Sequence, residues 1–252
     1  MKEIARLLGG SHLYKLNTPQ SDLDERYIYL NTDTANIVGL EKNTHIEHRD
    51  PTTDSFGFEL RAYLDSLRKT NTVAMEFLFA PSEAFSILTP EFEMVRANAK
   101  NLVNPEVYYK SLLGYLQAEL KLATGARTGK LGSKRKTQLD KFGFSPKNFV
   151  QLLRLAACGI EFYSTGNYTV DIMAYDEELG ILLLDIKTHP EKYDVQWLIK
   201  RVFAMEDLLK KTYTESLKTP SAYHYDPDIA NHIILQSYFP ILKNLLNENY
   251  TV

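Results

Sequence analysis

A Gly-Ser pair followed by two closely spaced aspartates constrains this chain more than any other feature. Residues 10 to 30 read GSHLYKLNTPQSDLDERYIYL. The Asn-Thr-Pro turn formers in the middle and the apolar run at the end predict a strand end, a loop and a second strand. In an extended strand side chains alternate between faces, so Asp22, Asp24 and Arg26 are expected to project from the same side.

This spacing predicts a site for a phosphate and a metal ion. Two carboxylates held this close repel each other, and a divalent cation is the commonest reason for a chain to tolerate them. Gly10 lets the backbone approach a ligand, and Ser11 offers a hydroxyl and an N–H to a phosphate oxygen. Together they indicate a nucleoside triphosphate with Mg2+. An Asp-x-Asp pair is also typical of a solvated strand end, and the pair alone leaves that alternative open.

The same stretch resembles the signature of the polymerase-beta-like nucleotidyltransferase superfamily. Within it, the sequence is most similar to the RlaP type, which are thumb-less polymerase-beta-like proteins of bacteria and large phages. Their pattern Gly-Ser-x-x-Tyr, Thr-Pro-x-Ser-Asp-x-Asp-x-Arg is matched by Gly10, Ser11, Tyr14, Thr18, Pro19, Ser21, Asp22, Asp24 and Arg26. Lys15 departs from the pattern, because the family usually has glycine after the tyrosine.

Two further blocks carry the resemblance along the chain. Residues 54 to 79 resemble a family segment of an acid, a helix and Asn-Pro, matched by Asp54, Asn71 and Glu76, with Thr72 where proline is usual. Residues 145 to 170 resemble a helix with a lysine and an Arg-Leu pair followed by Thr-Gly. That block is matched by Lys147, Arg154, Leu155, Thr165 and Gly166.

The resemblance implies roles for these residues. Asp22, Asp24 and Asp54 would be the catalytic carboxylates and would hold two Mg2+ or Mn2+ ions. Nucleotide contacts would come from Gly10, Ser11, Ser21, Arg26, Lys147 and Arg154, and supporting contacts from Tyr14 and Glu76. The third carboxylate rests on the family block alone, and a shifted strand register would select Glu47, Asp50 or Glu59 instead.

Three functions follow from this reading. The first is transfer of a nucleoside monophosphate from a nucleoside triphosphate such as ATP to a hydroxyl on RNA, for example a tRNA or RNA 3′ end, with release of pyrophosphate. The second is the same transfer to a protein hydroxyl, as in AMPylation. The third is nucleotide binding without catalysis. The acceptor, the nucleotide and the oligomeric state stay open.

Composition limits the partners and the compartment. The chain has 252 residues, 44% of them hydrophobic, and a formal net charge of -3, so contact with a polyanion such as RNA requires a local basic patch. Cys158 is the single cysteine, which excludes a disulfide framework and a cysteine-ligated zinc site. No stretch approaches the roughly 20 apolar residues of a membrane span, so we expect no membrane partner and a cytoplasmic location, in a bacterium or in the host of a phage.

The pattern along the chain predicts an α+β fold. We expect a small mixed β-sheet nucleotidyltransferase core flanked by helices over residues 1–104, and a mainly helical C-terminal domain over 105–252. Strands are expected at 2–8 and 26–30 and ending near Phe58, with helices over 59–69 and from Pro105. An apolar stripe of a later helix is expected to comprise Val195, Leu198, Ile199, Val202, Phe203, Met205, Leu208 and Leu209.

A basic, glycine-rich segment interrupts the second half. Residues 121–147 carry eight Lys or Arg residues against the single acid Asp140. The segment is either a solvated loop or a basic strip that holds phosphates of the nucleotide or of a polyanionic acceptor. Trp197 and Tyr213 are interpreted as packing residues rather than as a platform for bases.

Overall fold

The chain consists of two compact units. The computed structural model describes residues 1–41, 44–49, 53–126 and 133–249. Residues 1–107 and 223–252 form the first unit, and residues 108–222 form the second. This division differs from the expected domains 1–104 and 105–252, because the C-terminal helix packs on the first unit. The α+β class with a mixed sheet near the N-terminus is confirmed.

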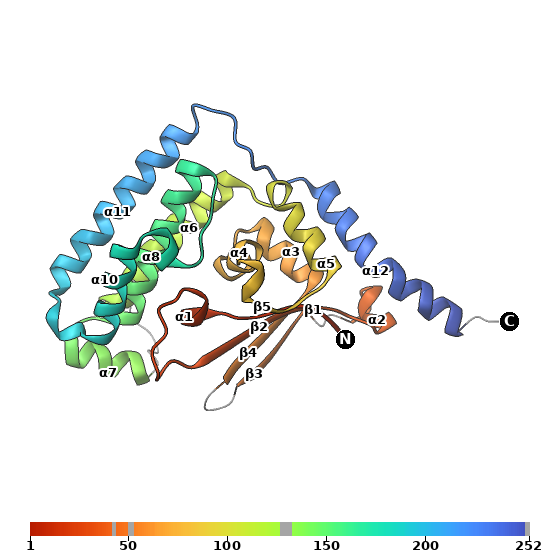
Figure 1. The fold of residues 1–252 in the computed structure, drawn as a ribbon, viewed down its shortest axis with the longest axis horizontal. Coiled ribbons are helices and arrows are strands. Elements are labelled where there is room, and N and C mark those ends of the chain that lie inside the picture. The colour runs from red at the N-terminus through yellow and green to blue at the C-terminus, as the bar shows by residue number, and fades with distance from the viewer. Residues whose placement is uncertain (42–43, 50–52, 127–132, 250–252) are drawn as a thin grey trace. The chain divides into compact units, whose positions relative to one another are not determined.

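A five-stranded sheet organises the first unit (Figure 1). Its order is β3-β4-β2-β1-β5, with β2 and β4 parallel and the other pairs antiparallel. The strands are β1 (Lys2–Leu8), β2 (Leu23–Leu30), β3 (His45–Arg49), β4 (Thr53–Glu59) and β5 (Phe85–Leu88). The three strands expected from the sequence are β1, β2 and β4. Strands β3 and β5 are not among those expected, because they are the short edge strands and carry little periodicity.

Helices cover one face of this sheet (Figure 1). The first unit contains α1 (Gly10–Leu13), α2 (Thr34–Ile37), α3 (Leu60–Arg68), α4 (Thr72–Phe79), α5 (Pro90–Ala97) and α12 (Pro227–Asn249), with short 3-10 turns at Ser82–Ala84 and Ala99–Asn101. The expected helix after Phe58 is α3, and its regularly spaced apolar side chains are all buried against β2 and β4. The ring of Tyr63 meets those of Phe77 and Phe92 edge to face at the centre of this core.

The start of α4 explains one family position. The side chain of Asn71 caps the helix by accepting hydrogen bonds from the backbone N–H groups of Val73 and Ala74, at 3.0 and 3.3 Å. Thr72 is therefore the first residue of the helix, a position that tolerates proline because its N–H has no helical partner. Threonine at this position is therefore compatible with the start of α4.

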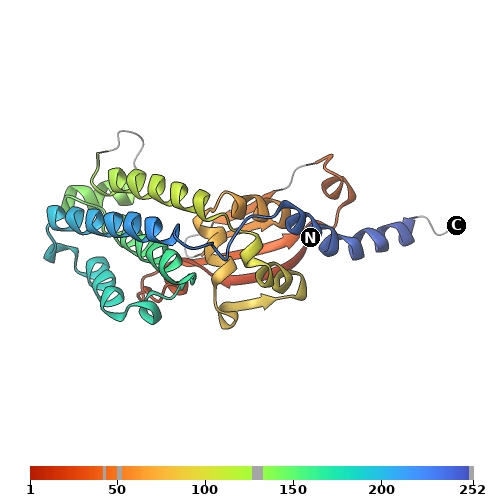
Figure 2. The same ribbon diagram turned by 90° about the horizontal axis from the view of Figure 1, so that it is seen from above.

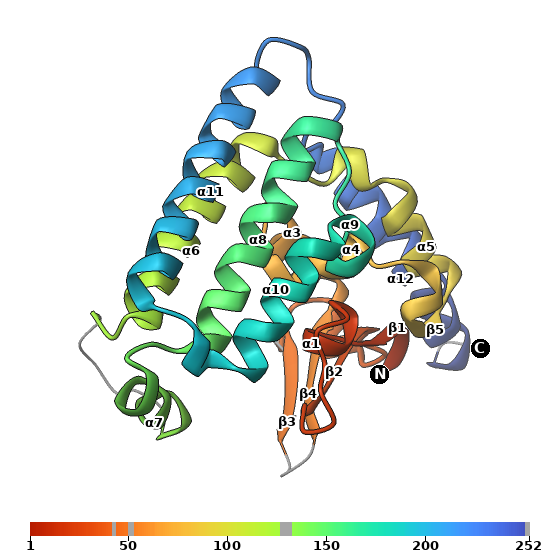
Figure 3. The same ribbon diagram turned by 60° about the vertical axis from the view of Figure 1, so that its left-hand side comes forward.

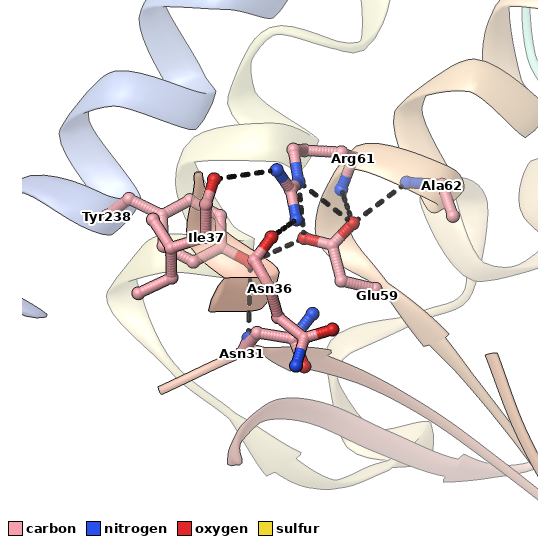
Figure 4. Close-up of polar contacts among 7 residues, drawn as sticks. All are labelled: Asn31, Asn36, Ile37, Glu59, Arg61, Ala62 and Tyr238. Atoms are coloured by element: carbon pink, nitrogen blue, oxygen red, sulfur yellow. Dashed lines mark hydrogen bonds and ion pairs between the residues drawn. The ribbon is translucent and has the colours of Figure 1, made fainter. Parts of the chain in front are cut away.

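The C-terminal helix α12 is fixed to the sheet by a buried polar cluster (Figure 4). Glu59 ends β4 and caps α3, accepting from the N–H groups of Arg61 and Ala62 at 3.0 and 3.3 Å. The hydroxyl of Tyr238, on α12, donates to Glu59 and accepts from the N–H of Asn31 at 3.1 Å. Burial, together with the bond to Glu59, raises the pKa of Tyr238.

The second unit is helical (Figures 2 and 3). It contains most of α6 (Pro105–Ala123), then α7 (Ser133–Phe142), α8 (Pro146–Thr165), α9 (Ile172–Tyr175), α10 (Glu177–Thr188), a 3-10 turn at Pro190–Lys192 and α11 (Val195–Ser216). Helix α8 packs against α10 and α11, and α6 meets α11 where the rings of Tyr109 and Tyr213 stack with centroids 3.7 Å apart. Tyr213 is therefore a packing residue, as expected.

The apolar stripe of α11 is narrower than the sequence indicated. Leu198, Val202 and Leu209 are buried, whereas Phe203 and Leu208 are exposed, which corrects the expected stripe. Helical periodicity places these two residues away from the buried line, so apolar character alone did not define the contact face. None of the described helices has the length and apolar character needed to cross a membrane.

Candidate active site

The sheet brings two carboxylates from distant segments together. Because β2 and β4 run parallel and in register, Asp24 lies directly opposite Asp54. Both side chains are partly open to solvent, with 26% of Asp24 and 37% of Asp54 exposed. Neighbouring strands are only about 4.8 Å apart, so the two acidic groups share one small region at the start of both strands.

Arg26 bridges this pair. Its Nη2 lies 3.1 Å from Oδ1 of Asp24 and 3.7 Å from Oδ2 of Asp54. Its Nη1 donates to the backbone carbonyls of Glu25 and Asp54, at 2.9 and 2.8 Å. The expected projection of Asp24 and Arg26 from one face is consistent with this contact. The guanidinium thus supplies positive charge to the two carboxylates and is held in place by hydrogen bonds to the backbone. The sequence suggested a phosphate contact for Arg26 and gave no sign of its contacts with the carboxylates.

The Gly-Ser turn lies against Asp24. Gly10 has a φ of +59°, a backbone region that disfavours side chains, and a Cβ at this position would lie only 2.1 Å from Oδ2 of Asp24. The N–H of Gly9 donates to the carbonyl of Asp24 at 2.7 Å. Ser11 follows within α1, where its carbonyl accepts from the N–H of Leu16 at 2.8 Å. Only glycine at position 10 lets this turn approach the carboxylate so closely.

Tyr14 and Glu76 connect this turn to α4. The hydroxyl of Tyr14 donates to Oε2 of Glu76 at 2.7 Å, and Glu76 is buried. Lys15 then adopts a φ of +58°, the left-handed region that glycine occupies at no steric cost. The departure at Lys15 therefore places a side chain where the backbone favours glycine. The sequence marked Tyr14 and Glu76 as matches but gave no reason to pair them.

The remaining matched residues lie in different surroundings. Asp22 is exposed immediately before β2, and Ser21 closes a turn, its Oγ accepting from the N–H of Thr18 at 2.9 Å. Lys147 and Arg154 belong to the second unit, both on α8. Lys147 is exposed, whereas Arg154 is buried and donates to the side chain of Gln151 at 3.2 Å.

The alternatives to Asp54 occupy other places. Glu59 lies at the far end of β4 in the cluster with Tyr238, and Glu47 lies on β3 opposite Phe56. Asp50 lies outside the described residues. Among the carboxylates described on β3 and β4, Asp54 is the one paired in register with Asp24.

The donor set has the chemistry of a magnesium site. Carboxylate oxygens are the ligands that Mg2+ prefers in proteins, and the missing Cβ of Gly10 leaves room beside Oδ2 of Asp24. In the described ranges, no three His, Cys, Asp or Glu side chains are grouped closely enough to share one ion. Asp24 and Asp54 thus supply two neighbouring oxygen donors of the type that Mg2+ prefers, and the exposed Asp22, two residues before Asp24, does not complete a group of three with them.

Comparison with known families gives one match. A family model described as "RlaP: RNA repair pathway DNA polymerase beta family" matches residues 4–142, which is more than half of the chain. The matched region includes Gly10, Asp24, Arg26 and Asp54. No curated protein matches the chain in the corresponding search.

Proposed function

The chain belongs to the RlaP family of RNA repair pathway proteins related to DNA polymerase beta, and from this premise we propose that it is a metal-dependent nucleotidyltransferase. It transfers a nucleoside monophosphate from a nucleoside triphosphate to an acceptor hydroxyl on RNA, such as a tRNA or RNA 3′ end. The observation that supports this most is the register of β2 and β4, which sets Asp24 opposite Asp54 beside the Gly10 turn.

The reaction requires positioning and charge neutralisation. The acceptor oxygen forms a bond to the α-phosphorus, the bond to the bridging oxygen of pyrophosphate breaks in line, and the hydroxyl proton passes to solvent. A bound Mg2+ or Mn2+ supplies positive charge for the phosphates and lowers the pKa of the attacking hydroxyl. Asp24 and Asp54 would hold the metal, with the exposed Asp22 as a further carboxylate two residues before Asp24, and the backbone at Gly10 with the Ser11 hydroxyl would bind phosphate oxygens.

Arg26 has a different role from a direct phosphate contact in this proposal. Its guanidinium is engaged by Asp24 and by two backbone carbonyls, so it orients the carboxylates before the substrate arrives. A positive charge between two like-charged groups reduces their repulsion while the metal is absent. Arg26 is therefore a positioning residue.

RNA as the acceptor rests on the family description and on charge. The protein carries a net charge of -3, so a polyanion must meet a local basic region. Within the described part of residues 121–147, Arg135, Lys136 and Lys141 lie on α7, and Lys147 follows on α8. These residues supply such a region.

A label-transfer experiment tests the proposal. The protein is incubated with each α-labelled nucleoside triphosphate, Mg2+ or Mn2+, and separate pools of tRNA, short RNA, DNA and cell protein. We expect label on RNA and equimolar pyrophosphate from the wild type, and neither from Asp24→Asn. Asp65→Asn, which alters an exposed carboxylate on α3, is the matched control and should behave like the wild type.

Other outcomes contradict specific parts of the proposal. Label on protein instead of RNA would favour AMPylation-type transfer. Triphosphate binding without turnover, equal in the wild type and Asp24→Asn, would favour a nucleotide-binding module.

A further inference from the structure

Trp197 is unusually open for a tryptophan in a helical bundle. It is the only tryptophan of the chain, it lies in the first turns of α11, and 43% of its surface is exposed. The next residue, Leu198, is fully buried. The packing role expected from the sequence therefore accounts for only part of this side chain, and tryptophan is enriched at interfaces because it combines an apolar ring with a polar N–H.

Trp197 lies between two neighbouring planar groups, and its ring is tilted by 39° relative to that of Tyr193. The ring of Tyr193 lies on one side, with centroids 5.8 Å apart, and the guanidinium of Arg201 lies 6.0 Å from the Trp197 ring centroid. Trp197 and Arg201 are four positions apart on one face of α11, and Tyr193 precedes the helix at the end of the 3-10 turn. Arg201 is exposed, and the row of Tyr193, Trp197 and Arg201 therefore presents aromatic and guanidinium planes to solvent.

The row is held in place by Asp185 at the end of α10. The hydroxyl of Tyr193 donates to its Oδ2 at 2.6 Å, and Lys192 and His189 bind its Oδ1 at 3.0 and 2.8 Å. These bonds, that of Tyr193 first, lower the pKa of Asp185 to about 2. Tyr193 is thus oriented before any ligand binds, and the negative charge of Asp185 is compensated locally.

Exposed basic side chains lie beside the row, together with the acids Asp185, Glu191 and Asp194. Lys192, Lys200 and Arg201 are exposed beside it, while Asp194, one of two acids in this segment with Glu191, is engaged as the cap of α11. Helix α7, which carries Arg135, Lys136 and Lys141, lies at the same end of the second unit as the start of α11 in all three views (Figures 1, 2 and 3). The exposed aromatic row and the basic helix therefore belong to one end of this unit.

We propose that Tyr193, Trp197 and Arg201 form a stacking platform for unpaired bases of the RNA acceptor, with the cations of α7 and of Lys200 on its phosphates. Every base has an aromatic face, so such a platform accepts single strands without reading their sequence. Planar guanidinium groups stack on bases as well as on aromatic rings. The identity of the ligand as RNA rests on the proposed function, whereas the platform itself rests on the geometry of this unit.

Because Trp197 is the single tryptophan of the chain, the intrinsic tryptophan fluorescence reports on ligand binding at the platform. In a titration of the full chain with a short single-stranded RNA, we expect quenching of Trp197 fluorescence as a base stacks on the ring. Trp197→Ala should weaken RNA binding about 5- to 100-fold, measured by anisotropy of labelled RNA, and Trp197→Phe should weaken it less. Phe203→Ala is the matched control, because Phe203 is an aromatic residue of similar exposure on another face of α11. Circular dichroism and thermal unfolding check that each variant keeps its fold.

Salt dependence separates stacking from phosphate contacts. Lys136→Gln and Lys141→Gln should each reduce the slope of log affinity against log salt by about 0.7, the value expected for one phosphate contact on a single strand. Arg201→Lys should weaken binding with little change in that slope, because lysine keeps the positive charge but lacks the planar guanidinium that stacks on a base.

Several results would overturn the platform. Unchanged fluorescence on RNA binding, equal affinity of the wild type and Trp197→Ala, or equal affinity for a fully paired RNA duplex would each do so. Label transfer to RNA with any of these results leaves the proposed function standing without the platform. Quenching by single-stranded RNA with no transfer to any acceptor leaves the platform standing and contradicts the proposed function.

Discussion

The two ends of the parallel β2–β4 pair each carry a carboxylate–arginine cluster, yet their surroundings are opposite. At the start of the strands, Asp24 and Asp54 face Arg26 and stay partly open to solvent. At the end, Glu59 is 1% exposed and is enclosed by Arg61 and Tyr238 (Figure 4). Asp54 and Glu59 are five steps apart on β4, which separates the clusters by about 17 Å at roughly 3.3 Å per residue.

The difference lies in how the charges are satisfied. Both oxygens of Glu59 accept hydrogen bonds, from the backbone, Arg61 and Tyr238, and Arg61 also donates to the carbonyls of Asn36 and Ile37 on α2. This closed cluster joins β4, α2, α3 and α12. A buried charge with all its partners stabilises a particular arrangement, whereas a solvent-open pair of carboxylates can still take a ligand. We infer that the open end, with Asp24 and Asp54, serves function and that the closed end, with Glu59, serves stability.

The largest expected effect tests the open end. Asp54→Asn should reduce nucleotide transfer about 10²- to 10³-fold, the range seen when one electrostatic group of an active site is removed. Its free energy of unfolding should change little, because removing one of two repelling carboxylates costs few favourable contacts. Pyrophosphate release and urea denaturation measure the two quantities. A large loss of stability with activity retained would mean that Asp54 is a structural residue.

The closed end should respond in the opposite way. Glu59→Ala removes the cap of α3 and leaves Arg61 and Tyr238 without their shared partner, so the free energy of unfolding should fall by about 2–4 kcal/mol. Transfer per folded molecule should be kept, as measured at a temperature well below the unfolding transition. Asp65→Ala, in an exposed ion pair on the same helix, is the control and should cost less than about 1 kcal/mol.

A glycine substitution tests the close approach of the Gly10 backbone to Asp24 at the open end. Gly10→Ala should destabilise the protein by about 1–2 kcal/mol through its left-handed backbone and, in addition, displace Asp24. Gly39→Ala is the matched control, since Gly39 also has a positive φ but an added Cβ meets nothing within 4 Å. We expect similar stability losses from backbone strain and a loss of triphosphate binding, measured by calorimetry, in Gly10→Ala alone. Equal binding in both variants would contradict the close approach to Asp24.

The smallest expected effects on stability come from two tyrosine substitutions, one near each end of the β2–β4 pair. Tyr14→Phe removes one hydrogen bond to Glu76 and should lower the free energy of unfolding by about 1 kcal/mol. Tyr238→Phe removes two, to Glu59 and from the N–H of Asn31, and should cost about 2 kcal/mol. Triphosphate affinity should fall only for Tyr14→Phe, because Tyr14 supports the turn beside Asp24. The reverse pattern would place function at the α12 end.

Local patterns predicted much of the first unit. The strand at 2–8, the helix after Phe58 and the helix start at Pro105 agree with β1, α3 and α6, because each is encoded by the periodicity and turn residues of a short window. The side chain alternation that put Asp24 and Arg26 on one face is likewise a local property of a strand. The family blocks added Asp54, Tyr14 and Glu76 as matches without giving their contacts.

Non-local contacts lay beyond those patterns. The register that sets Asp54 opposite Asp24, the return of α12 to the first unit and the pairing of Tyr14 with Glu76 each join segments far apart in the chain. The exposure of Trp197 could not be predicted from the sequence either, because apolar composition does not indicate which face of α11 another helix covers.

The sequence by itself thus determined which residues can do chemistry: a glycine able to turn tightly, acids and an arginine at alternating positions, and one tryptophan. Only the tertiary structure decided which carboxylate is enclosed and which stays open. Glu59 and Asp54 belong to the same strand, and they differ because Tyr238 and Arg61 surround one and solvent reaches the other. Burial depends on what the rest of the chain brings to a position, and that is a property of packing across long sequence distances.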